Sequence, residues 1–221
     1  MPSILICDDH VQMCETLFYY LKQHTECEIL KTVNSGEACL EFIKHQQEPT
    51  ILILDVQMPK GMSGYEVAKQ IQKHHPTIKI IANTMFGSRD VLEGMIRYGV
   101  RGFISKENSL NELVVSINAV LNNEYYFGEN FGLTPKDIIA IQNTPLDWLE
   151  TITPKENRLA NLLNEGHSLI DAAKELNISA SVAKKKRSNL FKKTKTDNIV
   201  ALLNRLKKLC IIWSDDEIKV A

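Results

Sequence analysis

Short apolar segments that alternate with amphipathic ones fill residues 1–122, and this alternation limits the possible folds more than any other feature of the chain. Five segments have the length and β-branched content of strands: Ser3–Cys7, Glu28–Val33, Ile51–Leu54, Ile78–Ala82 and Arg101–Ile104. Five others have helical spacing of apolar residues: Val11–His24, Ser35–His45, Gly64–His74, Arg89–Tyr98 and Ser109–Asn122. In the last, Ser109 and Glu112 match a capping box. The pattern predicts an α/β fold, a doubly wound five-stranded parallel sheet of order 2-1-3-4-5.

Helix signals without strand signals follow Thr153. Thr153, Pro154 and Glu156 form the pattern of a capped helix start, and Gly166 marks the end of that helix. Further helices are expected at Ser168–Leu176, from Ser179 to about Lys193, and from Thr196 or Asp197 to about Leu209. A short helix, a tight turn and a longer basic helix form a helix-turn-helix. The sequence predicts a small all-α domain at residues 153–221.

Residues 123–152 differ in composition from both neighbours. They are acidic and combine aromatic residues with Gly and Pro, and polar disordered linkers rarely contain so many aromatics. Short helical turns are expected at Asp137–Gln142 and Asp147–Glu150. We therefore predict a first domain at 1–122, a partly ordered linker at 123–152 and a second domain at 153–221.

The composition, with 44% hydrophobic and 24% charged residues among 221, is that of a globular protein. No apolar run approaches the ~18–20 residues that span a bilayer, and the N-terminus lacks the features of a signal peptide. The cysteines form no CxxC pair and are expected to be reduced thiols: Cys7, Cys14, Cys27, Cys39 and Cys210. We expect a cytoplasmic protein.

The formal net charge of −1 hides two halves of opposite sign. Residues 1–150 have 12 Lys+Arg against 19 Asp+Glu, a charge of −7, and residues 151–221 have 14 against 8, a charge of +6. The two parts are therefore expected to have different partners, and the basic part is the candidate for binding a polyanion such as DNA.

Polar residues follow the expected strands at the points where these end. Asp8 and Asp9 follow the first strand and Asp55 follows the third, which is its neighbour in the expected order. Three carboxylates this close repel one another unless a cation joins them, and oxygen ligands suit Mg²⁺. Thr84 follows the fourth strand and Lys106 the fifth. Such a set can hold a metal ion and an oxyanion together.

Each of these residues also has a simpler interpretation. Asp8 or Asp9 could cap the following helix, Asp55 could form a turn, and Lys106 could be a solvated surface lysine. The occurrence of all five at equivalent strand ends favours the functional interpretation.

Residues 3–122 resemble the receiver domain of two-component response regulators. The resemblance is carried by ICDDH (6–10), ILDVQMPKGMSG (53–64), GVRGFISK (99–106) and the threonine after strand four. It implies that Asp55 accepts a phosphoryl group from a sensor histidine kinase. It also implies that Asp9, Asp55 and the backbone carbonyl of Gln57 bind Mg²⁺, with Asp8 contributing mainly through water.

By the same resemblance, Thr84 and Lys106 contact the phosphoryl oxygens, and Phe103 is an aromatic switch that moves with them. One position departs from the family. The residue after the threonine is usually small, but here it is Met85, followed by Phe86. We expect these side chains to overhang the site and to change the rates of phosphorylation and hydrolysis, unless Met85 turns away into packing.

Residues 153–209 resemble the LuxR-type helix-turn-helix of the NarL/FixJ class, through ITPKE (152–156), LLNEGHS (162–168), AKELNIS (173–179) and SNLFKK (188–193). Its longer helix departs from the pattern. Val182 and Ala183 replace the usual Thr-Val, Lys186 stands where His is common, and Arg187 stands where an apolar residue is expected.

Residues 184–195 contain seven basic and no acidic side chains. A charge run is often only a solvated helix face, but on the second helix of a helix-turn-helix it favours DNA contact. The expected DNA-binding residues are Lys184, Lys185, Lys186, Arg187, Asn189, Lys192 and Lys193. Lys184, Lys185 and Lys192 are expected mainly on phosphates and Lys186 in sequence choice, whereas Leu190 and Phe191 are expected in the core.

We therefore expect a response regulator that controls transcription and is not an enzyme. Its expected partners are a sensor histidine kinase, double-stranded DNA and, after phosphorylation, a second copy of the chain. The candidate dimer surfaces are the face around Phe103 and the stripe from Ile199 to Leu209, which could equally be core. The alternative is a phosphorelay or protein-interaction switch whose altered helix-turn-helix does not read DNA, and RNA binding is a third possibility.

Overall fold

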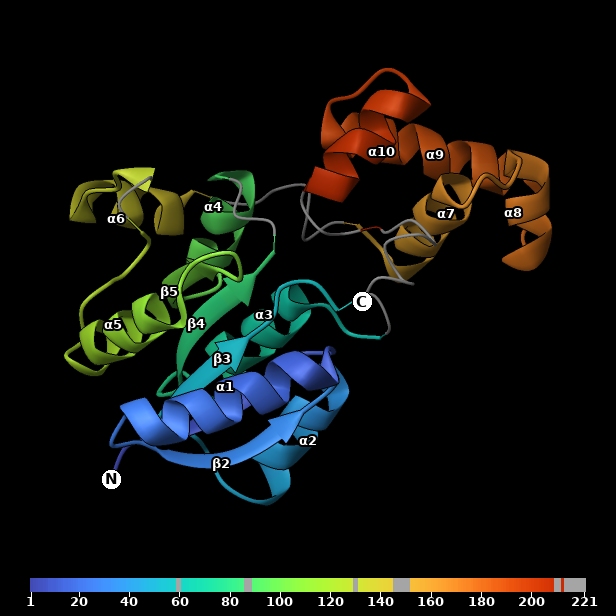
Figure 1. Ribbon diagram of the computed structural model, residues 1–221. Coiled ribbons are helices and arrows are strands. Elements are labelled where there is room, and N and C mark those ends of the chain that lie inside the picture. The colour runs from blue at the N-terminus through green and yellow to red at the C-terminus, as the bar shows by residue number, and fades with distance from the viewer. Residues whose placement is uncertain (59–60, 86–88, 129–130, 145–151, 209–211, 213–221) are drawn as a thin grey trace. The chain divides into compact units, whose positions relative to one another are not determined.

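The computed structural model describes residues 1–58, 61–85, 89–128, 131–144, 152–208 and 212. The chain divides into two compact units, Met1–Thr144 and Pro145–Ala221 (Figure 1). Within the described residues, no helix combines the length and the apolar character that crossing a membrane requires. The expectations for Phe86, Asp147–Glu150, Leu209 and Cys210 fall outside the described residues.

A five-stranded parallel sheet of order β2-β1-β3-β4-β5 forms the centre of the first unit, as the sequence predicts. Its strands are β1 (Ser3–Cys7), β2 (Glu28–Val33), β3 (Ile51–Leu54), β4 (Lys79–Thr84) and β5 (Val100–Ser105). Cys7 pairs with Leu54, and Leu54 pairs with Ala82. The residues that follow β1, β3 and β4 therefore lie at one edge of the sheet.

Helices cover both faces of this sheet: α1 (Val11–His24), α2 (Gly36–His45), α3 (Gly64–His74), α4 (Arg89–Arg97) and α5 (Leu110–Leu121). Helices α1 and α5 pack together against one face, and α2, α3 and α4 cover the other (Figure 1). All residues of β1 and β3 are buried. Burying one such Leu or Ile side chain contributes about 1.5–3 kcal/mol, so these central strands form a rigid base for the residues that follow them.

Local capping explains several helix starts, with one exception. The Ser63 side chain accepts a hydrogen bond from the Glu66 amide, and the Glu66 carboxylate accepts one from the Ser63 amide at 3.0 Å, which completes a capping box. The capping box expected at Ser109 is wrong, because its side chain makes no capping hydrogen bond. The Glu112 carboxylate instead accepts a hydrogen bond from the Tyr126 hydroxyl at 3.3 Å. A contact with a later segment has replaced the local cap.

The first unit continues beyond residue 122, where we expected a linker. Tyr126 forms a parallel bridge with Gly102 of β5, and α6 (Pro135–Asn143) packs against α4. Phe127, Ile138 and Ile141 of this segment are buried. The helical turn expected at Asp137–Gln142 is therefore part of a helix that belongs to the first compact unit.

The described part of the second unit contains α7 (Pro154–Asn164), α8 (Leu169–Glu175), α9 (Ala180–Thr194) and α10 (Ile199–Lys208). Gly166 follows α7 with a positive φ of 89°, the left-handed conformation expected at a helix end.

Helix α10 differs from its expectation at its start. The Asn198 side chain accepts a hydrogen bond from the Ala201 amide at 2.8 Å, so Asn198 holds the capping position that we expected of Thr196 or Asp197. Leu202 and Leu206 of α10 are fully buried against Leu190 of α9. Leu202 and Leu206 of the apolar stripe are therefore core residues, whereas Ile199 and Leu203 are only partly buried, and a dimer contact there stays a prediction.

Candidate functional site

The carboxyl edge of the sheet brings together the five residues that the sequence places at strand ends. Asp8 and Asp9 follow β1, Asp55 follows β3, Thr84 ends β4, and Lys106 follows β5. Asp8, Asp55 and Thr84 are buried, whereas Asp9 is half-buried. The Lys106 amide also donates a hydrogen bond to the Thr84 carbonyl at 2.9 Å.

The Lys106 ammonium joins two of the carboxylates. Its Nζ atom lies 2.6 Å from Asp55 Oδ2 and 2.8 Å from Asp8 Oδ2. Only 2% of the Lys106 side chain is exposed, so it is not the solvated surface lysine of the simpler interpretation. The Gln57 amide fixes Asp55 from the other side by donating to its Oδ1 at 2.9 Å. The Asp55 carboxylate is therefore held in one orientation by the protein alone.

The site carries more negative than positive charge. Burial raises the pKa of Asp55, the Lys106 ammonium lowers it, and the Asp8 carboxylate raises it again, which leaves it at about 7. Burial lowers the pKa of Lys106, but Asp55 and Asp8 raise it more, so its pKa lies above the usual value. Burial raises the pKa of Asp9, against the opposing effect of His10. A bound cation would relieve this excess of carboxylate.

The donor atoms at this edge fit Mg²⁺. Asp8, Asp9, His10 and Asp55 each offer one ligand atom, and these atoms lie within 4.8 Å of one another. Asp9 Oδ1 is buried and accepts no hydrogen bond among the described residues, although His10 Nδ1 lies 3.2 Å away. A buried carboxylate oxygen that accepts no hydrogen bond is costly unless a cation binds it, and carboxylate oxygens are ligands that Mg²⁺ prefers. The role of the Gln57 carbonyl as a further ligand stays a prediction.

The Thr84 hydroxyl is also without a partner. Thr84 is fully buried, and its Oγ1 makes no hydrogen bond within the described part of the chain. An unsatisfied buried hydroxyl costs about 1–3 kcal/mol, and most buried polar groups are therefore paired. A hydroxyl in this state at the end of β4 is ready to donate to an oxyanion bound at the same edge.

Two further residues of the site were missed by the sequence interpretation. His10 Nδ1 lies 3.2 Å from Asp9 Oδ1 and 3.4 Å from Asp8 Oδ1. At Gly64, an added Cβ would lie 2.3 Å from the Asp55 carbonyl oxygen, so α3 can approach Asp55 only with glycine there. The position of His10 directly after the two aspartates was a signal that could have been used.

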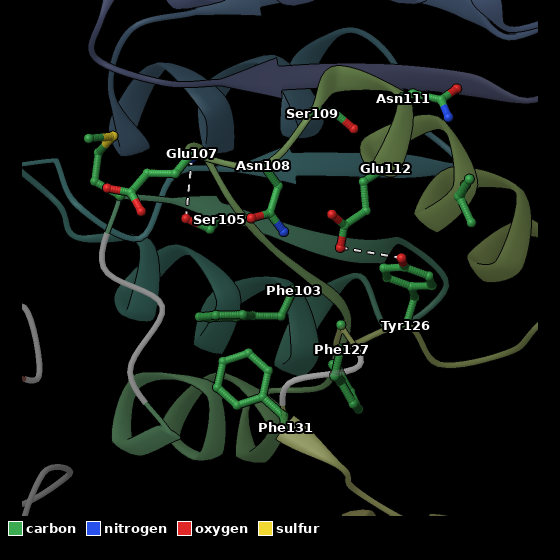
Figure 2. Close-up of a pocket in the computed structure, with 13 residues that line it drawn as sticks. Phe103, Ser105, Glu107, Asn108, Ser109, Asn111, Glu112, Tyr126, Phe127 and Phe131 are labelled. Carbon is green, nitrogen blue, oxygen red and sulfur yellow. Dashed lines mark hydrogen bonds between the residues drawn. The ribbon is translucent and has the colours of Figure 1, made fainter.

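Phe103 and Met85 line one cavity of about 670 Å³ beside this edge (Figure 2). Only 2% of Phe103 is exposed, and its ring meets Phe131 edge to face at a centroid distance of 5.8 Å. Phe131 therefore covers the Phe103 ring, and a dimer contact through the face around Phe103 stays a prediction. Met85 is 47% exposed, so it does not turn away into the core.

The basic helix α9 has one outward row of residues. Ala183, Leu190 and Thr194 are buried against the core. Successive residues of a helix are about 100° apart, so the opposite side carries positions 181, 185, 188 and 192. All four are exposed: Ser181, Lys185, Ser188 and Lys192. Lys184 is exposed beside this row, whereas Lys186, Arg187, Asn189 and Lys193 are half-buried.

Lys193 has a partner inside the second unit. Its Nζ lies 2.6 Å from Glu156 Oε2, and Glu156 is only 3% exposed. Burial raises the pKa of Glu156, but the hydrogen bonds from Lys193 and Thr153 lower it more, so its pKa lies below the usual value. The ion pair between Lys193 and Glu156 therefore links the end of α9 to the start of α7.

Comparison with known proteins adds an independent finding. The model of the response regulator receiver domain family matches residues 4–118. The chain is 24% identical over 208 residues to the transcriptional regulatory protein DesR of Bacillus subtilis, covering 94% of this chain and 98% of DesR. It is 25% identical over 201 residues to the oxygen regulatory protein NreC of Staphylococcus epidermidis, covering 86% of this chain and 90% of NreC.

Solved structures give the same fold. RcsB of Salmonella enterica serovar Typhimurium, bound to a promoter in the presence of the phosphomimetic BeF3−, covers 93% of this chain and 98% of its own length, with a TM-score of 0.59 and 24% identity. A DNA-binding response regulator of the LuxR family from Staphylococcus aureus covers 54% of this chain and 98% of its own, with a TM-score of 0.51 and 33% identity. With its sheet order, its strand-end residues and a family match over half of its length, this chain belongs to the response regulator receiver domain family.

Proposed function

We propose that this protein is a cytoplasmic response regulator, which accepts a phosphoryl group on Asp55 from a sensor histidine kinase and controls transcription through α9. The observation that carries the proposal is the buried strand-end site, in which Lys106 holds Asp55 while the Thr84 hydroxyl makes no hydrogen bond to any described residue. The relatives are named as regulators, which favours a regulatory role over that of a metabolic enzyme.

The proposed transfer uses the Asp55 carboxylate as nucleophile. One of its oxygens attacks the phosphorus of a phosphohistidine, a P–O bond forms, and the P–N bond breaks with its electron pair leaving on the imidazole nitrogen. That nitrogen then takes up a proton. Phosphoryl transfer needs mainly positioning and neutralisation of charge, and the hydrogen bond from Gln57 supplies the positioning.

The surrounding groups neutralise the charge of the transferred group. Mg²⁺, held by Asp8, Asp9, Asp55 and the carbonyl of Gln57, would supply Lewis-acid stabilisation of the phosphoryl oxygens. Lys106 lies within hydrogen-bond distance of Asp55 Oδ2 and becomes a donor to a phosphoryl oxygen there. The Thr84 hydroxyl donates to a second phosphoryl oxygen, which gives a hydrogen bond to a hydroxyl that makes none in the described part of the chain.

Incorporation of labelled phosphoryl groups from acetyl phosphate tests this assignment. Wild-type protein should be labelled only with Mg²⁺ present, Asp9→Ala should be labelled weakly, and Asp55→Asn should not be labelled at all. The matched control is Asp171→Asn, which changes an exposed aspartate of α8. Full labelling of Asp55→Asn would refute Asp55 as the acceptor.

For DNA binding, the outward row of α9 is the proposed contact surface. Lys185 and Ser188 lie in the middle of this row and are the residues best placed to reach base edges in the major groove. Lys184 and Lys192 are exposed near them and suit phosphate contacts. Lys186, which we expected to contribute to sequence choice, is half-buried and lies off the row. Lys193 is held by Glu156 and acts first as a structural residue.

A salt series of duplex DNA binding tests this surface. Replacing Lys184 or Lys192 by Ala should weaken binding to all sequences and lower the salt slope by about one, whereas Lys185→Ala should lose about 1–3 kcal/mol mainly on the preferred sequence. Lys155→Ala, which removes an exposed lysine of α7, is the matched control. Unchanged affinity after removal of all four charges at 184–187 would favour the protein-interaction alternative, and stronger binding of competing RNA would favour the RNA alternative.

Phosphorylation is also proposed to produce a homodimer that binds paired DNA half-sites, because a symmetric dimer reads two half-sites about one helical turn apart. Phe103, Leu202 and Leu206 are buried, so a dimer contact through either candidate surface would use the more exposed residues around them. Sedimentation of the phosphorylated protein as a monomer, both free and on DNA, would contradict this.

A further inference from the structure

His10 lies at the strand-end site, and the capping of α1 does not explain its presence there. It holds the position before α1, where Ser, Thr, Asp or Asn usually accept a hydrogen bond from the first turn, but its side chain makes no such bond. Its ring nitrogen Nδ1 lies instead 3.2 Å from Asp9 Oδ1 and 3.4 Å from Asp8 Oδ1. The imidazole is therefore directed at the two carboxylates that follow β1.

Most carboxylate oxygens of the site already have partners within the protein. Both oxygens of Asp55 accept hydrogen bonds, one from Lys106 and one from a backbone amide. Asp8 Oδ1 accepts one from the His10 amide at 3.0 Å, and Asp8 Oδ2 lies 2.8 Å from Lys106 Nζ. Among these carboxylates and the imidazole, two buried atoms make no hydrogen bond in the described part of the chain: Asp9 Oδ1 and His10 Nδ1.

The distance of 3.2 Å between these two atoms suits a shared cation. A protonated Nδ1 this close would be expected to donate a hydrogen bond to Asp9, but it donates none to any described residue. A neutral Nδ1 that presents its lone pair to a carboxylate oxygen is unfavourable unless a cation lies between them. Two ligands that are each ~2.1 Å from one ion lie about 3.0 Å apart at an octahedral angle and about 3.4 Å apart at a tetrahedral angle.

A nitrogen ligand changes which cation such a site prefers. Mg²⁺ binds mainly to oxygen ligands, whereas imidazole nitrogen is a preferred ligand of transition-metal dications. Mn²⁺ takes octahedral oxygen ligands as Mg²⁺ does, and it is the first ion of the transition-metal series that binds nitrogen and oxygen sites with rising affinity. The His10 side chain is 34% exposed, so its ring borders solvent on one side and the site on the other.

We propose that His10 is a metal ligand of the strand-end site, bound through Nδ1, and that it makes the site favour a transition-metal dication such as Mn²⁺ over Mg²⁺. The inference rests on the proposed function, because it concerns the cation that assists phosphoryl transfer to Asp55. Asp9 Oδ1 and His10 Nδ1 bind the cation directly. Asp55 offers a further ligand atom within 4.8 Å of these two and has lone pairs beyond those used by its hydrogen bonds.

Mn²⁺ binding by the unphosphorylated, full-length protein tests the proposal without any phosphoryl transfer. The EPR signal of free Mn²⁺ measures binding during a titration, and competition by Mg²⁺ gives the preference between the two ions. The wild-type preference for Mn²⁺ should fall about tenfold in His10→Phe, which keeps an aromatic ring but has no nitrogen ligand. His74→Phe, which removes an exposed imidazole of α3, is the matched control and should bind both ions as wild type does.

Pulsed EPR of the bound Mn²⁺ identifies the ligand itself. Coupling between the metal electrons and an imidazole nitrogen should be present in wild type and in His74→Phe, and absent from His10→Phe. His10→Gln is the second variant, because its polar amide suits the half-exposed position and offers an oxygen ligand. It should retain Mn²⁺ and Mg²⁺ binding but lose the nitrogen coupling, a result that a purely structural role of His10 does not produce.

The outcomes distinguish this inference from the proposed function. Wild-type protein that binds Mn²⁺ without nitrogen coupling overturns the role of His10 and leaves the proposed function standing. Nitrogen coupling that persists in His10→Gln, an unchanged preference in His10→Phe, or undiminished Mn²⁺ binding in Asp9→Ala also overturns it. If wild-type protein binds neither ion and takes up no phosphoryl group from acetyl phosphate, the proposed function fails and the role of His10 fails with it.

Discussion

Replacing Lys106 by methionine should destabilise the folded protein by an amount that grows with pH. The ammonium of Lys106 lies 2.6 Å from one oxygen of Asp55 and 2.8 Å from one of Asp8, and all three side chains are almost fully buried. Breaking a buried ion pair by removing one partner costs about 3–5 kcal/mol when the remaining charge stays ionised. Here the remaining carboxyl can take up a proton instead.

The direction of this pH dependence follows from the pKa of Asp55. With Lys106 present this pKa is about 7, already above the value of an unfolded aspartate. Loss of a neighbouring positive charge should raise it by a further ~1–3 pH units, which corresponds to about 1.4–4 kcal/mol. Since the folded variant then binds a proton that the unfolded chain releases, its stability falls further as the pH rises through this window.

Urea unfolding in EDTA at about pH 6 and about pH 9 measures the effect as the change in the free energy of unfolding. The gap between wild type and Lys106→Met should widen by about 1.4–2.7 kcal/mol from the lower to the higher pH, because pH 9 lies at most ~2 units above the wild-type pKa of about 7. Lys73→Met, an exposed lysine of α3, is the matched control and should show no widening. A gap for Lys106→Met that does not change with pH would refute the electrostatic account of the site.

Three further predictions follow from single contacts. Gly64→Ala would place a methyl group 2.3 Å from the Asp55 carbonyl oxygen. It should therefore cost about 1–3 kcal/mol of stability and slow phosphorylation by up to ~100-fold, whereas Gly132→Ala, whose added methyl meets nothing within 4 Å, should leave the rate unchanged. Glu156→Gln should lower the stability of the second unit by about 1–3 kcal/mol near neutral pH, measured by thermal unfolding. Because the folded pKa of Glu156 is lowered, this difference should disappear as the pH falls through that folded pKa, and a difference that persists in acid would contradict the pairing with Lys193. Met85→Ala should change the rate of phosphorylation or of hydrolysis without changing stability, because Met85 is 47% exposed beside the site. If the variant is phosphorylated and hydrolysed at the wild-type rates, Met85 does not control access to the site.

The sequence predicted the sheet and its strand-end residues because both depend on local patterns. Buried strands need apolar runs such as Ile51–Leu54, and the residue after such a run lies at the carboxyl edge whatever the rest of the chain does. Asp55 and Lys106 each follow an expected strand, so their positions alone indicate that both lie at this edge.

What the sequence did not predict depends on contacts between distant segments. The Ser109 side chain makes no capping hydrogen bond, and Glu112 bonds instead to Tyr126, fourteen residues further along the chain. Residues 123–144 were taken for part of a linker because Tyr126 pairs with β5 and α6 packs on α4, which are contacts that no local pattern reveals. Lys186 and Lys193 were placed with the other basic residues of α9, but the packing of Ala183 and Leu190 into the core turns them away from the exposed row.

Chemical trapping of the phosphorylated residue tests the central claim most directly. Borohydride reduces an aspartyl phosphate to homoserine, so peptide mass spectrometry of the reduced, full-length protein identifies the acceptor by its change in mass. The account predicts homoserine at Asp55 alone, dependent on Mg²⁺ and absent without a phosphodonor. Homoserine at another aspartate, or no conversion of Asp55 in protein that carries a phosphoryl group, would contradict it.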